Sequence, residues 1–317
     1  MKEKIYIPIK INENDIHISN DNIKEIEKNL DKKILLELVH EDFTSINIQN
    51  QKNILAKINE TMQKYKIYGI KITSSPDSVD KKNLKFLKKF KVKEIELKIE
   101  SSNDYILKHI GADFKFEYAK KIAKQIKFLR FALGITVTIG LPESTALDDL
   151  NTVKQSIGLK PIHITLIPCQ INYNNEVKKL FDENDFEPLS KVQLIERLKE
   201  SIKLISNAKI KSISIGYEGQ HIDDMDIEDF RDLIASDMWY DRIVEMIKSY
   251  NVKVKVVEIE VNEADINIVK GIDNCNLNKL KEVYDVELQI SKNDKIDKGN
   301  YKMKILKTYT DFLDEDN

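Results

Sequence analysis

Three stretches of the sequence decide the fold: EIELKIESSNDYILKHIGADF at residues 94–114, GITVTIGLPESTALDDL at 134–150 and HITLIPC at 163–169. Each opens with a short segment rich in Ile, Leu or Val, and the first two continue into Ser, Asn, Gly or Pro. The second and third open as near-continuous apolar runs, which are typical of parallel strands buried on both faces. We therefore expect these stretches to form interior strands of a parallel sheet.

The same pattern extends outward to the rest of the first half of the chain. Strands are predicted at 5–11, 34–39, 67–73, 94–99, 135–140 and 162–167. Between them, amphipathic helices are predicted at 22–30, 51–66, 81–90, 117–133 and 146–159. Strand–helix alternation of this kind means parallel pairing with right-handed crossovers. Six consecutive units favour an open, partial (β/α)6 barrel of α/β class over a small doubly wound sheet.

After Pro168 the regular alternation of strands and helices ends, and the chain is predicted to divide there. Residues 1–170 form the predicted barrel, and 171–250 an extension with a polar loop, a helix at 192–206, a strand at 210–216 and one or two helices at 226–250. Residues 251–308 read as strand, helix, helix, strand, strand, which predicts a small α+β module. Residues 309–317 are an acidic tail.

Composition excludes several classes of protein. Lys and Arg number 51 against 53 Asp and Glu, so the near-zero net charge argues against a wholly basic nucleic-acid-binding surface but leaves a local patch open. We find no apolar run of about 18 residues and no signal peptide, so we expect no membrane association and a cytoplasmic location. Two cysteines, Cys169 and Cys275, are too few for a disulfide framework.

The quoted stretches carry a family resemblance. Residues 96–101, 139–149 and 166–169 resemble the ELGVQS, IGLPG and IYPT segments of the radical S-adenosylmethionine superfamily, specifically of bacterial relatives of the elongator catalytic subunit. Residues 212–220 resemble a later family segment, IRIGLQ. The resemblance implies a partial TIM-like barrel with a helical extension and a C-terminal module of KH type.

One family motif is missing. The family binds a [4Fe–4S] cluster through CxxxCxxC after the first strand, whereas residues 12–22 contain no cysteine. Cys169 and Cys275 do not replace three closely spaced thiolates. We therefore predict a degenerate member with no iron–sulfur cluster and no reductive cleavage of S-adenosylmethionine by this chain alone.

Part of the family's cofactor pocket is retained. The resemblance assigns cofactor binding to Glu100, Ser101, Gly140, Leu141 and Pro142. The family's Gly-Gly turn after the second strand is replaced by residues 40–42, His-Glu-Asp, which read as a solvated loop in preference to a new acid–base or metal site. We assign no catalytic residue and no metal ligand, and His163 reads as a core or rim residue.

The C-terminal module carries a variant of the KH loop. In KH folds a GxxG turn between two helices lets a nucleic-acid backbone approach. Here the turn is Gly-Ile-Asp-Asn at 271–274, so Asn274 replaces the second glycine. Weak RNA binding, tRNA included, is predicted at Lys270, Gly271, Asn274 and Lys279, and a packing module without RNA affinity is the alternative.

Two functions from different classes follow. The favoured prediction is a cluster-less pseudoenzyme, a binding or regulatory protein that acts with RNA, with a catalytic relative or with another protein. The alternative is an enzyme or sensor that binds S-adenosylmethionine or a nucleotide in the retained pocket, or one with radical-type activity only beside a catalytic partner. A label by homology would still be radical S-adenosylmethionine, elongator-like.

Overall fold

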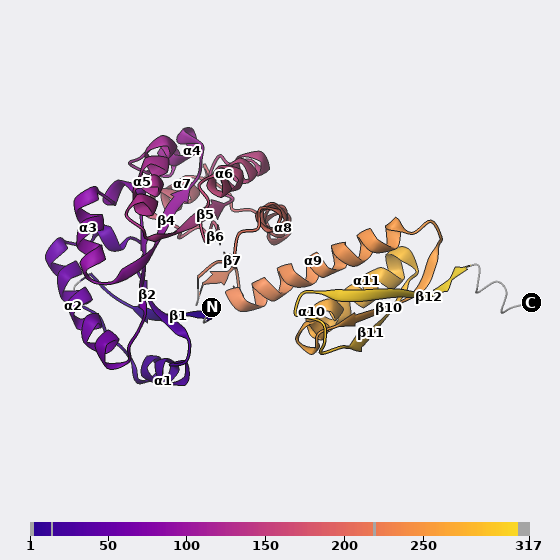
Figure 1. Ribbon diagram of the computed structural model, residues 1–317. Helices are drawn as coiled ribbons and strands as arrows, with labels where there is room; N and C mark the ends of the chain where they lie inside the picture. Colours follow the sequence, from indigo (N-terminus) through magenta and orange to yellow (C-terminus); the bar gives the residue numbers. More distant parts are fainter. Residues whose placement is uncertain (1–2, 14, 218–219, 310–317) are drawn as a thin grey trace, which may run out of the picture. The chain divides into compact units, whose positions relative to one another are not determined.

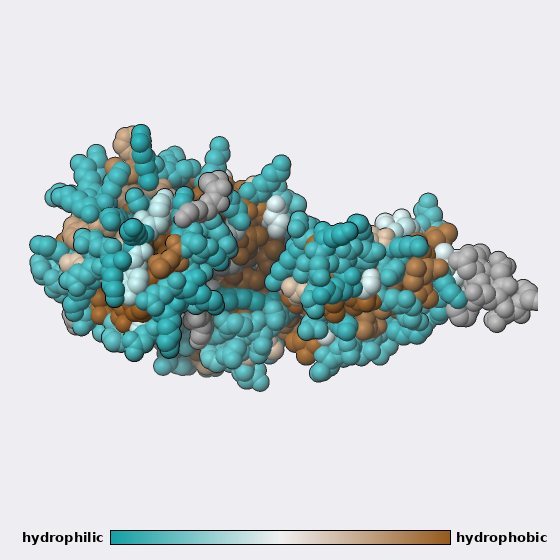
Figure 2. Space-filling model, turned by 60° about the horizontal axis from the view of Figure 1, so that its bottom comes forward, coloured by the Kyte–Doolittle hydropathy of each residue, from teal (hydrophilic) through white to brown (hydrophobic). Residues whose placement is uncertain are grey.

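The computed structural model of the protein describes residues 3–13, 15–217 and 220–309. The chain forms two compact units, Met1–Tyr217 and Glu218–Asn317, and each is described by itself. None of the helices in the described part is both long and apolar enough to cross a bilayer. Figure 2 shows hydrophilic residues over most of the face in view, with hydrophobic residues in separate patches.

The first unit is built on one parallel sheet of seven strands in the order β1-β2-β3-β4-β5-β6-β7. Strand order therefore follows chain order, as a half-barrel requires. The strands are β1 (Lys4–Lys10), β2 (Lys33–Val39), β3 (Gly69–Ser74), β4 (Val92–Glu100), β5 (Ala132–Ile139), β6 (His163–Pro168) and β7 (Ser212–Ile215).

Helices connect the strands and lie around the outside of the sheet (Figure 1). They are α1 (Asn20–Lys28), α2 (Ile48–Lys64), α3 (Lys81–Lys89), α4 (Asp104–His109), α5 (Phe116–Phe128), α6 (Ala146–Gly158), α7 (Asn175–Asp182) and α8 (Lys191–Asn207), with short 3₁₀ turns η1 (Phe43–Ser45) and η2 (Pro76–Ser78). In α5 the residues at three- and four-residue spacing, such as Ala119, Ile122 and Ile126, are buried. That spacing places one apolar stripe against the sheet.

The second unit has a three-stranded sheet in the order β11-β10-β12, with β10 parallel to β11 and antiparallel to β12. Trp239, Ile243, Val257 and Leu280 are among the residues of its core. Its elements are β8 (His221–Ile222), β9 (Met225–Asp226), α9 (Ile227–Ser249), β10 (Val254–Val261), η3 (Glu263–Asp265), α10 (Ile266–Lys270), η4 (Ile272–Asn274), α11 (Cys275–Tyr284), β11 (Glu287–Lys292) and β12 (Tyr301–Thr308).

The half-barrel of α/β class is the fold that the sequence predicts, and three details differ. The helix predicted to reach residue 133 ends at Phe128, because Arg130 adopts a left-handed φ of 62° and Ala132 already joins β5. α4 is an additional helix inside the quoted stretch 94–114. The chain divides after Tyr217, and not at 170 and 250, because β7 pairs with β6 and α9 contributes Trp239 to the second core.

Candidate functional site

The five residues predicted to bind a cofactor lie together at the carboxyl edge of the sheet. Glu100 ends β4 and Ser101 follows it, while Gly140, Leu141 and Pro142 follow β5. β4 and β5 are parallel neighbours, so the turns that follow them meet at one edge. All five residues are buried, and Glu100 exposes only 8% of its surface. The edge where parallel α/β folds place ligands is therefore covered here.

Glu100 is held by a tyrosine from a distant part of the chain. The Tyr173 hydroxyl donates a hydrogen bond to Glu100 Oε1 at 2.5 Å and lies 3.0 Å from the Thr138 hydroxyl. Burial and then the charge of Glu100 raise the pKa of Tyr173 well above its usual range, so the phenol stays protonated. Glu100 itself has a φ of 62° beside a register shift in β4. Its carboxylate is thus already bound within the chain.

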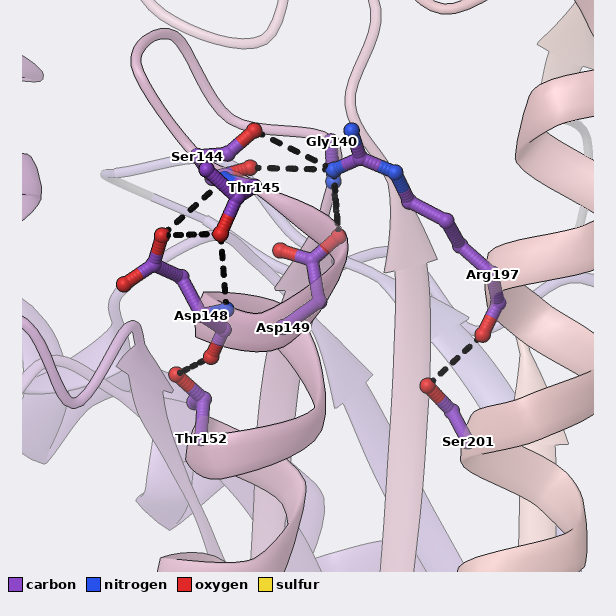
Figure 3. A network of polar contacts seen from close by, with 8 residues as sticks. All are labelled: Gly140, Ser144, Thr145, Asp148, Asp149, Thr152, Arg197 and Ser201. Carbon is purple, nitrogen blue, oxygen red and sulfur yellow. Dashed lines mark hydrogen bonds and ion pairs between the residues drawn. The ribbon is translucent and has the colours of Figure 1, made fainter.

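The backbone N–H of Gly140 is likewise hydrogen-bonded to another residue of the chain. Its N–H donates to Asp149 Oδ2 at 3.2 Å, and Arg197 Nη1 from α8 donates to the same oxygen at 2.9 Å (Figure 3). Arg197 also donates to the Ser144 carbonyl oxygen at 3.2 Å. Burial raises the pKa of Asp149, and the Arg197 guanidinium opposes that shift. These contacts connect the turn after β5 to α6 and α8.

The beginning of α6 is fixed by a capping box. The Thr145 hydroxyl accepts from the Asp148 N–H, and the Asp148 carboxylate accepts from the Thr145 N–H at 3.0 Å (Figure 3). Asn103, after β4, donates to the other Asp148 oxygen at 3.1 Å. Hydrogen bonds from Thr145 and then Asn103 lower the pKa of Asp148. Asp148 therefore completes the capping box of which Thr145 is the N-cap.

The chain's own segment 169–190 covers this edge. Cys169 and Val177 pack with Leu141 in one apolar cluster, and Tyr173 and Phe186 pack against it. Leu189 lies directly over Gly140, because a Cβ added to that glycine would stand 2.7 Å from Leu189 Cδ1. We define residues 169–190 as the covering segment, since its side chains lie against Glu100, Gly140 and Leu141.

The residues of this chain do not fit a [4Fe–4S] cluster, which needs three thiolates close together. The connection between β1 and α1, residues 11–19, contains no cysteine. Cys169 is buried at the end of β6, where burial raises the pKa of its thiol, and Cys275 begins α11 in the second unit. In the described residues no group of three His, Cys, Asp or Glu side chains is arranged to hold a metal ion.

His40, Glu41 and Asp42 form a turn after β2. The Asp42 N–H donates to His40 Nδ1 at 3.1 Å, and Asp42 Oδ1 accepts from the Thr44 N–H at 3.1 Å. Ser78 also donates to Asp42 Oδ1 at 2.8 Å. Asp42 is therefore a capping residue for η1.

Sequence reasoning missed a network of buried ions on the concave side of the sheet. Lys71 Nζ lies 2.7 Å from Glu37 and 2.5 Å from Glu96. His163 Nδ1 lies 3.1 Å from Glu94, and its Nε2 lies 3.4 Å from Glu96. Burial alone would lower the pKa of His163, but the hydrogen bond to Glu94 and the charge of Glu96 outweigh it and raise the pKa to about 9.

The signal for this network was present in β4. Glu94, Glu96 and Lys98 alternate with buried apolar residues, which places the three charged side chains on one face. Gly134 in β5 completes the arrangement, because a Cβ there would stand 2.2 Å from the His163 ring. An alternating pattern inside a parallel strand therefore indicates a polar concave face.

The four residues predicted to bind RNA lie in the second unit, around the turn between α10 and α11. Gly271 has a φ of 78°, and Asn274 a left-handed φ of 59°. Lys270 is half-buried, Gly271 is buried, and Lys279 Nζ lies 5.5 Å from the centre of the Tyr240 ring. The turn is sharp, as expected, and its role in RNA binding stays a prediction.

Comparison with solved structures identifies the fold. An Elp3 from the archaeon Methanocaldococcus infernus, with an N-terminal deletion, superimposes with a TM-score of 0.56 at 17% identity over 70% of this chain and 58% of its own. Coproporphyrinogen III oxidase from Escherichia coli, a radical SAM enzyme, gives 0.46 at 12% identity over 65% and 53%. The hydrogenase maturase HydG gives 0.42 at 12% identity over 74% and 55%.

These likenesses concern the fold. The chain spans between half and three-fifths of the length of each of these structures. No family model and no curated protein matches the sequence. The chain therefore shares its fold with the archaeal Elp3 structure at low sequence identity.

Proposed function

We propose that this chain, which has the half-barrel fold of radical S-adenosylmethionine enzymes, is a cluster-less pseudoenzyme that acts as a binding or regulatory protein. The observation that carries the proposal is the covering segment. Leu189 lies over Gly140 and Tyr173 is hydrogen-bonded to Glu100, so the chain itself fills the edge at which the resemblance expects a cofactor. The cysteine-free connection after β1 supports the same conclusion.

The electrostatics of this edge support binding over catalysis. Glu100 accepts from Tyr173, Asp149 pairs with Arg197, and Asp148 accepts from the backbone N–H of Thr145 in the capping box of α6. A general acid needs a proton to donate, and a general base an atom that accepts one, within reach of a substrate. Each of these three carboxylates is instead engaged by groups of the chain.

Iron analysis tests the absence of the cluster. The protein is purified without oxygen, reconstituted with iron and sulfide, and compared with the double variant Cys169→Ser/Cys275→Ser. We expect equal, substoichiometric iron in both proteins, because neither thiol has a neighbouring thiol with which to bind a cluster. One [4Fe–4S] cluster per chain that disappears in the double variant would overturn the proposal.

Thermal unfolding with S-adenosylmethionine tests the covered edge. A ligand that binds only the folded state at 100 times its Kd stabilises that state by about 2.7 kcal/mol, which is a readily measured rise in Tm. We expect no rise for the protein and compare it with Leu189→Ala, which opens space above Gly140. A rise with the unaltered protein would favour the alternative, a sensor or enzyme that uses the retained pocket.

A further inference from the structure

Five connections that lead from a helix into a strand carry an unusual set of charges. With the adjoining ends of the helices and the first two residues of β4, they are residues 64–68, 88–93, 127–131, 158–162 and 207–211, at the starts of β3, β4, β5, β6 and β7. None contains Asp or Glu, whereas the connection before β2, residues 29–32, contains Asp31 beside Lys32. Their basic residues, all exposed, are Lys64, Lys66, Lys88, Lys89, Lys91, Lys93, Lys127, Arg130, Lys160, Lys209 and Lys211.

The fold gathers these connections at one edge. β3 to β7 are consecutive parallel neighbours, so their amino ends lie side by side although they span nearly 150 residues of sequence. We call the eleven basic residues the basic face. It lies at the amino edge of the sheet, opposite the edge that holds Glu100 and Gly140.

The carboxyl edge has the opposite charge. The connections that follow β1 to β6, residues 11–19, 40–47, 75–80, 101–103, 140–145 and 169–174, contain no Lys or Arg. Their acidic residues are Glu13, Asp15, Glu41, Asp42, Asp77, Asp80 and Glu143. The net charge of the whole chain is near −2, but the first unit has one positive and one negative edge. A polyanion is attracted only to the positive edge.

Compensation of the helix dipoles explains part of the basic face. Lys88 donates to the Leu129 carbonyl oxygen at 2.6 Å, and Lys127 donates to that of Leu159 at 2.9 Å. Five further cations stand just beyond the helix ends, with left-handed φ values where glycine is the favoured residue. They are Lys66, Lys91, Arg130, Lys160 and Lys209. The chain retains a cation at each of these positions despite its conformational cost.

Aromatic rings lie among the cations. Phe128 is 83% exposed and Tyr68 is 42% exposed. Lys33 and Lys93 lie 5.3 and 5.8 Å from the centre of the Tyr68 ring. Phe128 lines two neighbouring hollows of about 600 and 500 Å³. Their charged lining residues are Lys81, Lys121, Lys124, Lys127 and Lys160, with Glu117 the one acidic side chain among the lining residues described.

We propose that the basic face, with Phe128 and Tyr68, binds single-stranded nucleic acid. Lysines would neutralise phosphates while exposed rings stack on unpaired bases, which is the combination that non-specific single-strand binding uses. The inference rests on the proposed function, because it names the ligand class of a chain proposed to act as a binding protein. An anionic membrane fits less well, since it requires a continuous apolar helix face, and the apolar faces of α2, α3 and α5 are buried against the sheet.

The left-handed positions allow a test that protects the fold. The five-fold variant Lys66→Gly, Lys91→Gly, Arg130→Gly, Lys160→Gly and Lys209→Gly removes five charges and gives each position its favoured residue. A matched control removes five exposed lysines away from the basic face: Lys10→Gln, Lys24→Gln, Lys52→Gln, Lys178→Gln and Lys179→Gln. Both variants change the net charge by the same amount.

Fluorescence anisotropy measures binding of labelled oligouridylate and oligothymidylate of roughly 12 nucleotides over a range of salt concentrations. We expect the glycine variant to bind at least tenfold more weakly than the control, with a salt slope smaller by about 0.7 for each phosphate that the variant no longer neutralises. Phe128→Ala should weaken binding by about tenfold, because the exposed ring no longer stacks on a base. The ratio of the affinities for oligouridylate and oligothymidylate shows whether the basic face prefers RNA or DNA.

Two results would overturn the inference directly: no binding of either oligonucleotide at low salt, or equal weakening of binding in the glycine variant and the control. A third is weaker binding in the variant Lys270→Gln/Lys279→Gln alone. That result would assign the binding to the C-terminal turn. Binding of anionic phosphatidylserine vesicles without binding of oligonucleotide would assign the basic face to membranes instead. Iron content is measured independently, so failure here leaves the pseudoenzyme proposal standing, and cluster loading would not remove the basic face.

Discussion

At the scale of single residues, His163 couples the stability of the half-barrel to pH. Its imidazole lies between Glu94 and Glu96, and its pKa in the folded state is raised to about 9, above the value of about 6.5 expected for an unfolded chain. The folded state therefore binds the proton more tightly. The contribution is complete below about pH 6.5 and is lost as the pH rises through about 9.

We therefore expect the free energy of unfolding to fall by about 3 kcal/mol between about pH 6 and pH 9.5, as measured by urea unfolding at each pH. His163→Gln should flatten this dependence. His221→Gln, which alters an exposed imidazole of the second unit, should leave it unchanged. A slope that survives in His163→Gln would assign the dependence to other groups.

At the scale of elements, the turn after β5 depends on a glycine that its neighbours enclose. Gly140 has a φ of 80°, and an added Cβ would stand 2.7 Å from Leu189. We expect Gly140→Ala to lower the free energy of unfolding by at least about 1 kcal/mol, because the left-handed backbone and the close contact both oppose a side chain.

Gly158 provides the matched control in the next helix. It is the last residue of α6, and no atom lies within 4 Å of the position of its Cβ. Gly158→Ala should raise the free energy of unfolding by about 0.5 kcal/mol, since alanine favours the helix. Equal effects of the two substitutions on urea unfolding would contradict the role assigned to the covering segment.

At the scale of the whole molecule, the second unit has a core of its own. Trp239 and Ile243 of α9 pack with Val257 of β10 and Leu280 of α11. We expect residues 220–309, produced alone, to unfold cooperatively, because this core needs no residue of the first unit. Circular dichroism during thermal unfolding measures this. A piece that begins at residue 251, as the predicted boundary would have it, lacks α9 and should not unfold cooperatively.

The sequence by itself determined the α/β class, the parallel strands and the scarcity of thiols, because short apolar runs and residue types are local properties. It did not predict the covering segment or the buried ion network. Glu100 and Tyr173 lie 73 residues apart, and Arg197 lies 48 residues from Asp149, so no local pattern connects them. The end of α5 was also mispredicted, since the left-handed Arg130 leaves no distinct signal in a run of apolar and basic residues.

The distribution of charge also depends partly on the sequence and partly on the tertiary structure. The basic and acidic connections are visible in the sequence, but there they alternate along a chain whose total charge is only about −2. Only the parallel sheet separates them, because every helix-to-strand connection reaches its amino edge and every strand-to-helix connection its carboxyl edge. Residue types and local periodicity thus come from the sequence, whereas the tertiary structure decides which side chains meet and which edge carries each charge.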